Sequence, residues 1–377
     1  MTTSLHLINC FKSLLKHIKT TTKSVFFHLL PLFFTPYISA NLIDLEDLAQ
    51  DFVLETKKIE IPLYPGAFNP SIIRWHGNLL MSFRVIQDPK HSFNSQLGII
   101  WLDEEFNPIS EPQLLNTRDG SSNVPSRAED GKLIAINDQL FMVYSDNTDP
   151  VISRGGFRVY VSRLDFEGER CVMKNIECLS SFEGMSPFVR EKNWVPFEYN
   201  QSLFLAYSLN PHFILSPQLL GNGHCETFAL SQGHIQWDWG TLRGGTPGLL
   251  HDGKYLAFFH SSKDMATLHS EGKSISHYFI GAYTFQSHPP FSITSISPSP
   301  IIGKQFYHGK VPKPYWKSLR VVFPGGYISD GEYIWMVYGR QDRELWVVKL
   351  DKKGLLQSLV PVSPIENDYI PMCSKDL

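Results

Sequence analysis

The feature that most constrains the fold is a unit of two strands joined by a tight turn, which recurs five times along the chain. Each unit begins with glycine, proline or polar residues, turns at a polar or glycine-containing pair, and returns through alternating apolar and aromatic residues. Two of the turns are Asp-Gly pairs, which are strong β-hairpin signals. The units span residues 69–85, 129–146, 194–210, 245–261 and 324–340, with predicted turns at His76-Gly77, Asn137-Asp138, Asn200-Gln201, Asp252-Gly253 and Asp330-Gly331.

Each hairpin is followed by a further strand-like run, such as QLGIIWLD at 96–103 and LWVVKLD at 345–351. Three or four strands per unit, repeating at roughly 50 to 80 residues, are typical of β-propeller blades. No segment after residue 52 has a sustained 3.6-residue apolar period, and residues 41–55 are predicted to form one short helix. We therefore predict an all-β fold, a five-bladed β-propeller formed by a single domain, 41–377, after a short N-terminal extension.

The first 40 residues differ in character from the rest of the chain. Lysines at 12, 16, 19 and 23 precede the apolar stretch SVFFHLLPLFFTPYISA, which ends in the small residue Ala40. This order resembles a secretory signal, and the stretch is too short for a comfortable membrane span. We predict that residues 1–40 direct export or anchor the protein to a membrane, which it would contact only through this segment. Otherwise the protein is expected in the cytoplasm.

The composition argues against several classes of function. The net charge is −3 and no long basic run follows the first 25 residues, so no nucleic-acid partner is predicted. The five cysteines form no CxxC pair, and no two histidines stand at metal-ligand spacing with a carboxylate, so no metal is predicted. No phosphate-binding glycine loop or nucleophile elbow occurs, and no cofactor is predicted. The 13% of aromatic residues favours strands and suits stacking on sugars.

In a propeller the innermost strand of each blade begins near one opening of the central funnel, so distant stretches of chain converge there. The five starts are FNPS, RAED, KNWVPF, RGGTP and FPGG, which form a polar ring with few acids. Such a ring is the default ligand site. Because successive side chains of a strand point to opposite faces, only one of Glu129 and Asp130 should face the funnel, and we predict Asp130. Glu129 is expected to pair with Arg127 or with a neighbouring blade.

As an ordered set, these motifs resemble those of glycoside hydrolase family 130, whose five-bladed propellers act on β-mannosides as phosphorylases or hydrolases. The resemblance covers residues 60–351 and rests on FNPS with Arg84 in SFRV, on RAED, on His260 in FFHS, and on YGRQD ending at Asp342. It implies that Asp130 is the general acid for the glycosidic oxygen, acting directly or through a sugar hydroxyl. The residues that the resemblance places against the reacting sugar are Asn69, Arg84 and Asp342.

The chain also departs from the family's motifs. EDGK stands where the family has Glu-Asp-Pro-Arg, so the second arginine of the family's motif is missing and Lys132 is the nearest cation. LAYSLNP stands where phosphorolytic members tend to have a His-Arg pair. Phosphate is held best by guanidinium groups. Inorganic phosphate as co-substrate and hydrolysis with a carboxylate base therefore both stay open. The base candidates are Glu198, Glu226, Asp264 and Asp342, and the further candidate ligand contacts are Arg127, Asn193, Arg243 and His260.

The sequence leaves three functions open. The first is an enzyme that cleaves a β-mannoside-type bond in an oligosaccharide or glycoside, with Asp130 as general acid. The second is a β-1,2-mannosyltransferase on the same fold, and the third is a propeller that only binds sugar or docks to a protein. Single residues also have structural alternatives. Asn69 could start a turn, Arg84 could pair with Asp88, and Trp194 could belong to the core.

Overall fold

The computed structural model describes seven parts of the chain. No helix in these parts is long and apolar enough to cross a membrane. The predicted N-terminal segment, residues 1–40, lies outside the described residues. The described residues are 42–91, 94–118, 126–147, 156–179, 182–183, 190–308 and 318–365.

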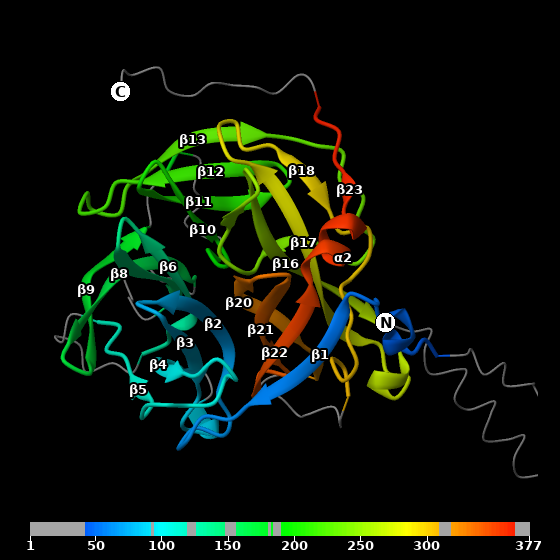
Figure 1. The fold of residues 1–377 in the computed structure, drawn as a ribbon, viewed down its shortest axis with the longest axis horizontal. Coiled ribbons are helices and arrows are strands. Elements are labelled where there is room, and N and C mark those ends of the chain that lie inside the picture. Colours follow the sequence, from blue (N-terminus) through cyan, green and yellow to red (C-terminus); the bar gives the residue numbers. More distant parts are fainter. Residues whose placement is uncertain are drawn as a thin grey trace, which may run out of the picture. The chain divides into compact units, whose positions relative to one another are not determined.

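Four antiparallel sheets of four strands each contain most of the strands that the structure describes (Figure 1). Their strands are, in order across each sheet, β2 (Phe68–Trp75), β3 (Asn78–Val85), β4 (Gln96–Leu102) and β5 (Gln113–Leu114); β6 (Glu129–Ile136), β7 (Gln139–Asp146), β8 (Arg158–Glu167) and β9 (Arg170–Leu179); β10 (Val195–Tyr199), β11 (Ser202–Leu209), β12 (His212–Pro217) and β13 (Cys225–Ser231); and β20 (Val322–Asp330), β21 (Tyr333–Arg340), β22 (Glu344–Asp351) and β1 (Val53–Ile59). In each sheet a predicted hairpin supplies the first two strands.

The remaining predicted unit, residues 245–261, belongs to a larger, seven-stranded sheet. Its centre is the long antiparallel pair β16 (Lys254–Met265) and β17 (Ile275–Gln286). The all-β, propeller-like prediction is thus confirmed, whereas only four of the sheets have the regular four-stranded form. The short elements are β14 (Arg243–Gly244), β15 (Leu249–His251), β18 (Ile293–Ile296), β19 (Leu319–Arg320), β23 (Val360–Pro361), η2 (Pro89–His91), η3 (Leu268–Ser270) and α2 (Lys352–Ser358).

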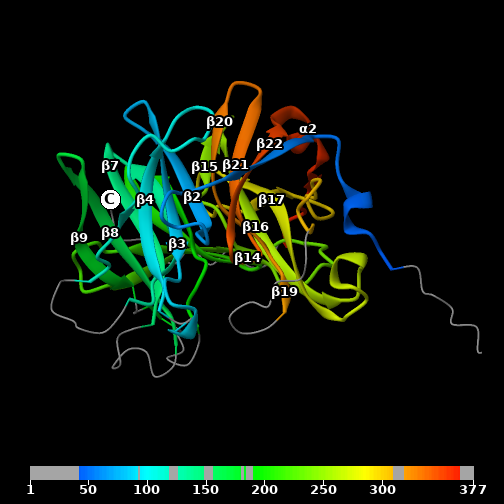
Figure 2. The ribbon, with the colours of Figure 1, turned by 90° about the horizontal axis from the view of Figure 1, so that it is seen from below.

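The sheets follow one another around a common centre. β2 contacts β20 on one side and β6 on the other, β6 contacts β10, β11 contacts β14, and β16 contacts β20, which closes the circle. In Figure 2 strands β2, β3, β4, β20 and β21 run side by side between two faces of this circle. Apolar side chains fill the layers between neighbouring sheets, such as Leu80, Leu97, Leu133 and Met142 between the first two.

Two-residue turns join the strands of the first four hairpins, as predicted. Both turn residues have positive φ, for example 47° at Asn137 and 56° at Asp138. This conformation matches the twist of the flanking strands, and Asn, Asp and Gly adopt it at the least cost. The fifth turn begins one residue later than predicted, because Asp330 still pairs with Tyr333 in the ladder.

The predicted helix over residues 41–55 is wrong. Only η1 (Leu45–Leu48) is helical, as a single 3-10 turn, and the strand β1 begins at Val53. β1 pairs antiparallel with β22, with Val53 opposite Leu350. A strand partner far away in the sequence therefore overrides the local helical pattern, and β1 completes the sheet that β20, β21 and β22 begin.

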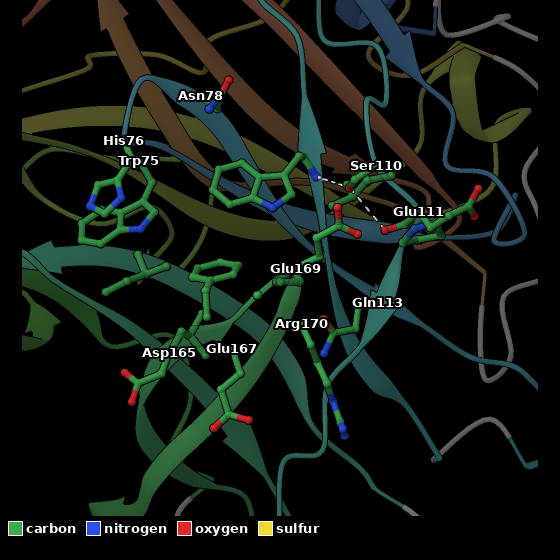
Figure 3. Close-up of a pocket in the computed structure, with 18 of the residues that line it drawn as sticks. Trp75, His76, Asn78, Ser110, Glu111, Gln113, Asp165, Glu167, Glu169 and Arg170 are labelled. Atoms are coloured by element: carbon green, nitrogen blue, oxygen red, sulfur yellow. Dashed lines mark hydrogen bonds between the residues drawn. The ribbon is translucent and has the colours of Figure 1, made fainter.

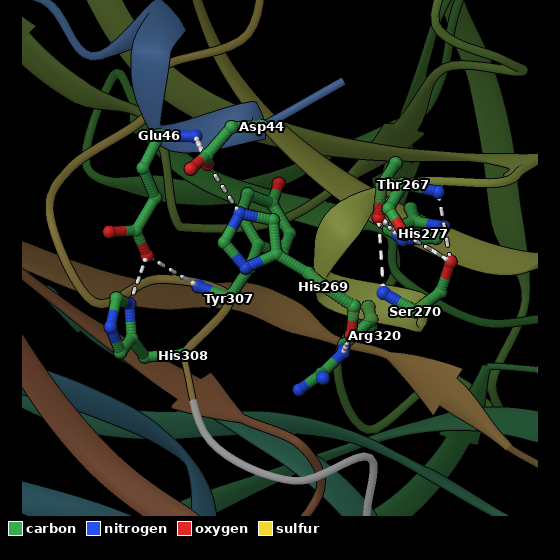
Figure 4. Close-up of polar contacts among 9 residues, drawn as sticks. All are labelled: Asp44, Glu46, Thr267, His269, Ser270, His277, Tyr307, His308 and Arg320. Carbon is green, nitrogen blue, oxygen red and sulfur yellow. Dashed lines mark hydrogen bonds and ion pairs between the residues drawn. The ribbon is translucent and has the colours of Figure 1, made fainter. Parts of the chain in front are cut away.

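Carboxylate–histidine contacts hold η1 in place (Figure 4). Asp44 Oδ1 accepts a hydrogen bond from the backbone N–H of Glu46 at 2.9 Å and contacts His269 Nε2 at 2.8 Å. Glu46 Oε1 contacts His308 Nδ1 at 3.0 Å. His269 belongs to η3, in the loop between β16 and β17. These contacts fasten the first described residues to the seven-stranded sheet.

Candidate active site

A β-bulge lies near the inner end of both β2 and β6. In β2 the register shifts between Phe68 and Ser71, and in β6 it shifts between Glu129 and Lys132. The residue after the first of each pair has a left-handed backbone, with φ of 48° at Asn69 and 56° at Asp130. Asn and Asp tolerate this conformation better than most residues, and a bulge re-aims side chains at a strand end. Each bulge therefore directs one polar side chain, that of Asn69 or Asp130, out of the ladder near the inner end of its strand.

The two bulges bring three strands to one buried polar cluster. Asn69 Nδ2 donates to Asp130 Oδ1 at 2.9 Å. The guanidinium of Arg84, on β3, contacts Glu129 Oε1 at 2.6 Å and Asp130 Oδ1 at 3.5 Å. The Arg84 side chain is only 6% exposed, and those of Glu129 and Asp130 are 12% and 13% exposed. The prediction that only one of the two acids faces the cluster is wrong, because the bulge breaks the alternation of side chains.

Glu129 binds two cations from neighbouring sheets. Besides Arg84, the ammonium of Lys192 contacts Glu129 Oε2, and the same ammonium lies 3.3 Å from the centre of the Phe157 ring. Of the two predictions for Glu129, the pairing with a neighbouring blade is confirmed. Arg84 pairs with Glu129 and Asp130 and not with Asp88, whose carboxylate contacts His91 at 2.7 Å. Lys192 belongs to the stretch KNWVPF, but no sequence signal distinguishes it from its neighbours.

Asp130 and Asp342, which is close enough for its pKa to respond to the charges of the cluster, have opposite pKa shifts. Burial raises the pKa of Asp342 to about 7. Arg84 acts to lower this pKa, and the negative charges of Asp130 and Glu129 offset part of that effect. Burial also acts to raise the pKa of Asp130, but Arg84, Lys192, the hydrogen bond from Asn69 and Lys132 together hold it below its usual range. Of the two aspartates, only Asp342 has a raised pKa. In the free protein Asp130 is therefore ionised near neutral pH, whereas Asp342 gains and loses its proton around pH 7.

A second polar group lies on β14 and β16, where Arg243 and His260 are opposite each other in the antiparallel ladder. His260 Nδ1 donates to the carbonyl of Gly244 at 2.9 Å, and burial with the nearby Arg243 lowers the pKa of His260 to about 3. The ring is therefore neutral and presents Nε2 as a hydrogen-bond acceptor. Such an acceptor fits a hydroxyl donor better than it fits an anion. A Cβ on Gly244 would lie 2.0 Å from the carbonyl oxygen of Asn193, so this close approach of two backbones requires glycine.

The charge of Asp130 links both polar groups, because it acts on the pKa values of Lys132, His260, Tyr278 and Asp342. Burial lowers the pKa of Lys132 to about 8, and this residue is only 3% exposed. The rings of Tyr278 and His260 are parallel, with centroids 5.8 Å apart. Tyr278 belongs to no motif, so the sequence offered no signal for it. Asp130 and these four residues therefore lie close enough for its charge to act on them, and we call this group the polar region.

Other residues singled out in the sequence have no such link among the described residues. The Nε atom of Arg127 is buried there without a hydrogen-bond partner. Glu198 is exposed and accepts a backbone N–H of the turn after β10 at 2.8 Å, and Glu226 is exposed on β13 at the edge of its sheet. Asp264 is exposed on β16, and Trp194 is a core residue. No group of three or more His, Cys, Asp or Glu in the described ranges is placed to hold a metal ion.

The substitution Asp342→Asn should change how stability depends on pH. Because the pKa of Asp342 is about 7 in the folded protein and ordinarily 3.8, the folded state binds more protons between these values. The protein therefore loses stability as the pH rises through this window, and the variant escapes that loss. Urea denaturation at about pH 4.5 and 7.5 should show the variant gaining on the wild type toward pH 7.5. The control Asp264→Asn should follow the wild type, and parallel curves for Asp342→Asn would contradict the raised pKa.

No family model matches the chain, and no curated protein matches it. Solved structures do match it in fold. A mannose phosphorylase from Leishmania mexicana, in complex with phosphate ion, has a TM-score of 0.55 at 13% identity over 87% of this chain and 96% of that one. A β-1,2-mannobiose phosphorylase from Listeria innocua, in complex with β-1,2-mannobiose, has a TM-score of 0.50 at 15% identity over 83% and 95%.

A third structure comes from work on glycoside hydrolase family 130, described as mannoside phosphorylases that include hydrolases of β-1,2 mannosidic linkages in Candida mannan. Its TM-score is 0.56 at 11% identity, over 77% of this chain and 85% of that one. The chain thus has a fold like that of glycoside hydrolase family 130, as its motifs predicted. At these identities the similarity concerns the fold alone.

Proposed function

We propose that this protein is a carbohydrate-active enzyme that cleaves a β-mannoside-type glycosidic bond. The observation that carries the proposal is the buried cluster in which Arg84 holds Glu129 and Asp130 beside a third carboxyl group, that of Asp342. Cleavage of such a bond needs a proton for the leaving oxygen, and paired carboxyl groups with separated pKa values supply one. Support also comes from the similar folds, because the three structures are described as acting on mannosides.

We assign the general-acid role to Asp130. Near neutral pH Asp130 is ionised in the free protein, and Asp342, whose pKa is about 7, still carries a proton in part of the molecules. A sugar bound against Asp130 replaces the remaining water around it, and this loss of solvation favours the protonated form. Asn69 and Arg84 donate hydrogen bonds to Asp130 and so hold its carboxyl group in position.

The second reactant is either water or inorganic phosphate. A phosphate would meet the charges of Arg243 and Lys132, whereas Lys192 is already bound to Glu129. Neutral His260 offers an acceptor and would not stabilise an anion. The neutral His260 and the binding of Lys192 by Glu129 favour water, whereas Arg243 and Lys132 favour phosphate. With water as the reactant, Asp342 is the base candidate, because its pKa responds to the charge of Asp130. Phosphate stays in the proposal as the alternative co-substrate.

We further infer that the seven-stranded sheet serves as a fifth blade. Its strands β14 and β16 contact β11 and β20, and they occupy the place between the neighbouring sheets where the circle would otherwise be open. Its extra strands are short: β14 pairs with β16, β19 pairs with β17, and β23 pairs with β18. The sheet contributes His260 and Tyr278 to the polar region.

The full-length protein should be incubated with β-1,2-mannobiose, β-1,4-mannobiose and aryl β-mannosides, each with and without phosphate. Hydrolysis would release mannose in both conditions, and phosphorolysis would release mannose 1-phosphate only with phosphate. Circular dichroism confirms in parallel that the protein is folded. If folded protein cleaves none of these compounds but extends a mannoside from an activated mannosyl donor, the proposal fails and the transferase takes its place. If neither reaction occurs, the enzyme proposal fails altogether.

A further inference from the structure

A groove with a volume of about 1560 Å³ lies between the first two sheets, at the hairpin ends of their inner strands (Figure 3). We call it the hairpin-end groove. Its walls come from the turn between β2 and β3, from β4 and β5, from the start of β7, and from the turn between β8 and β9. Along β2 and β3 it is separated from Asn69 and Arg84 by the length of the strands, about 20 Å. It is therefore distinct from the candidate active site.

The hairpin-end groove is lined by aromatic rings. Trp75 stacks on His76 with ring centroids 4.4 Å apart, and Trp101 lies 5.4 Å from Phe166 of the neighbouring sheet. Both tryptophans are only partly buried, so part of each indole ring is accessible. Figure 3 shows Trp75 and His76 at one end of the groove. Aromatic faces of this kind pack against the apolar face of a sugar ring.

The polar lining has an excess of acids. Five carboxylates but only two guanidinium groups line the groove. Arg163 is bound by both oxygens of Asp165, at 2.8 and 2.7 Å, whereas Glu111 and Glu169 are exposed. In Figure 3 Glu111 lies at the opposite end from Trp75. The acidic excess repels anions such as phosphorylated sugars, and carboxylates accept hydrogen bonds from hydroxyl groups.

The groove is fixed before any ligand arrives. The Gln113 side chain of β5 donates to the carbonyl of Cys171 at 2.6 Å and accepts from the N–H of Cys171 at 2.8 Å. This pair of bonds joins the two sheets at the floor of the groove. The volume exceeds the roughly 300–1,000 Å³ of an ordinary small-molecule pocket, so the groove has room for several linked units.

From these features we propose that the hairpin-end groove binds a neutral oligosaccharide chain, away from the cleaved bond. Sugar rings lie on Trp75 and Trp101, and hydroxyl groups donate to Glu111 and Glu169. The proposal goes beyond the function proposed above and does not depend on it, because it concerns binding by residues that take no part in the polar cluster.

Calorimetric titration of the full-length protein with mannohexaose, cellohexaose and laminarihexaose tests the proposal. At least one should bind, and Trp75→Ala should weaken that binding at least tenfold while leaving turnover of a small aryl β-mannoside unchanged. Because Trp75 also packs on the core, a second variant with Glu111→Lys and Glu169→Lys changes only exposed side chains and should weaken binding as well. The matched control Trp335→Ala, on β21 and outside the groove, should bind as the wild type does.

Three results would overturn the proposal. The first is no binding of any hexaose, and the second is equal affinity in wild type and in the double lysine variant. The third is a concentration-dependent dimer in light scattering that Trp75→Ala abolishes, which would show the groove to be a contact between copies of the chain. Hexaose binding that depends on Trp75 without any mannoside turnover would uphold this inference and contradict only the enzyme proposal.

Discussion

Replacing Asp130 by asparagine is expected to lower turnover of β-mannobiose by about 10²–10⁴-fold, the usual contribution of a general acid. Asparagine also tolerates the left-handed backbone at this position, where φ is 56°, so the bulge should persist. The same variant should retain much more activity on 2,4-dinitrophenyl β-mannoside, because this leaving group departs without a proton. Steady-state kinetics on the two substrates measure the difference.

The control is Asp264→Asn, which changes an exposed aspartate of β16 and should leave both rates unchanged. Asp342→Asn separates the two members of the carboxyl pair. If it, and not Asp130→Asn, shows selective loss on β-mannobiose, Asp342 is the acid and the assignment to Asp130 is wrong. Full activity of Asp130→Asn on both substrates would remove Asp130 from the chemistry.

Arg84→Met should destabilise the protein by about 3–5 kcal/mol, because it leaves Glu129 and Asp130 buried without their shared cation. Methionine keeps most of the apolar stem that packs near Phe68, over whose ring the guanidinium lies at 5.0 Å. The loss should shrink in acid, because Arg84 helps to hold the pKa of Asp130 low and this carboxylate can take up a proton there. Urea denaturation at about pH 7 and pH 5 measures both effects.

Arg74→Met is the matched control for this substitution. Arg74 lies on β2 and also binds a carboxylate, that of Glu104, at 2.8 Å, but its side chain is 40% exposed. Exposed ion pairs contribute little, so the control should cost less than about 1 kcal/mol. Equal losses for Arg74→Met and Arg84→Met would contradict a special role for the buried cluster.

The hairpins were predictable because their signals are local. A turn such as Asn137-Asp138 and the alternating residues on either side of it lie within a few positions of each other. β1 was not predictable in this way, because Val53 finds its partner Leu350 at the other end of the described chain. The seven-stranded sheet was missed for the same reason, since strands such as β19 and β23 are two residues long and exist only through distant partners.

The site was predictable as a place but not in its detail. The repeat indicated that FNPS and RAED meet, and Asn69 does bind Asp130. The bulge at Asp130 has no clear signal in the sequence, so the expected alternation of Glu129 and Asp130 failed. The carboxyl group with the raised pKa could not be predicted either, because the pKa of Asp342 depends on burial and on charges from other sheets.

The pairing of β1 with β22 also has a consequence for how the molecule assembles. Residues about 300 positions apart must meet before the circle is complete, and such distant closure is slow. During synthesis on the ribosome, the edge of β1 remains unpaired until its partner strand β22, residues 344–351, has emerged. An exposed strand edge invites pairing with other chains, so a nascent or C-terminally shortened chain should be prone to aggregate at this seam.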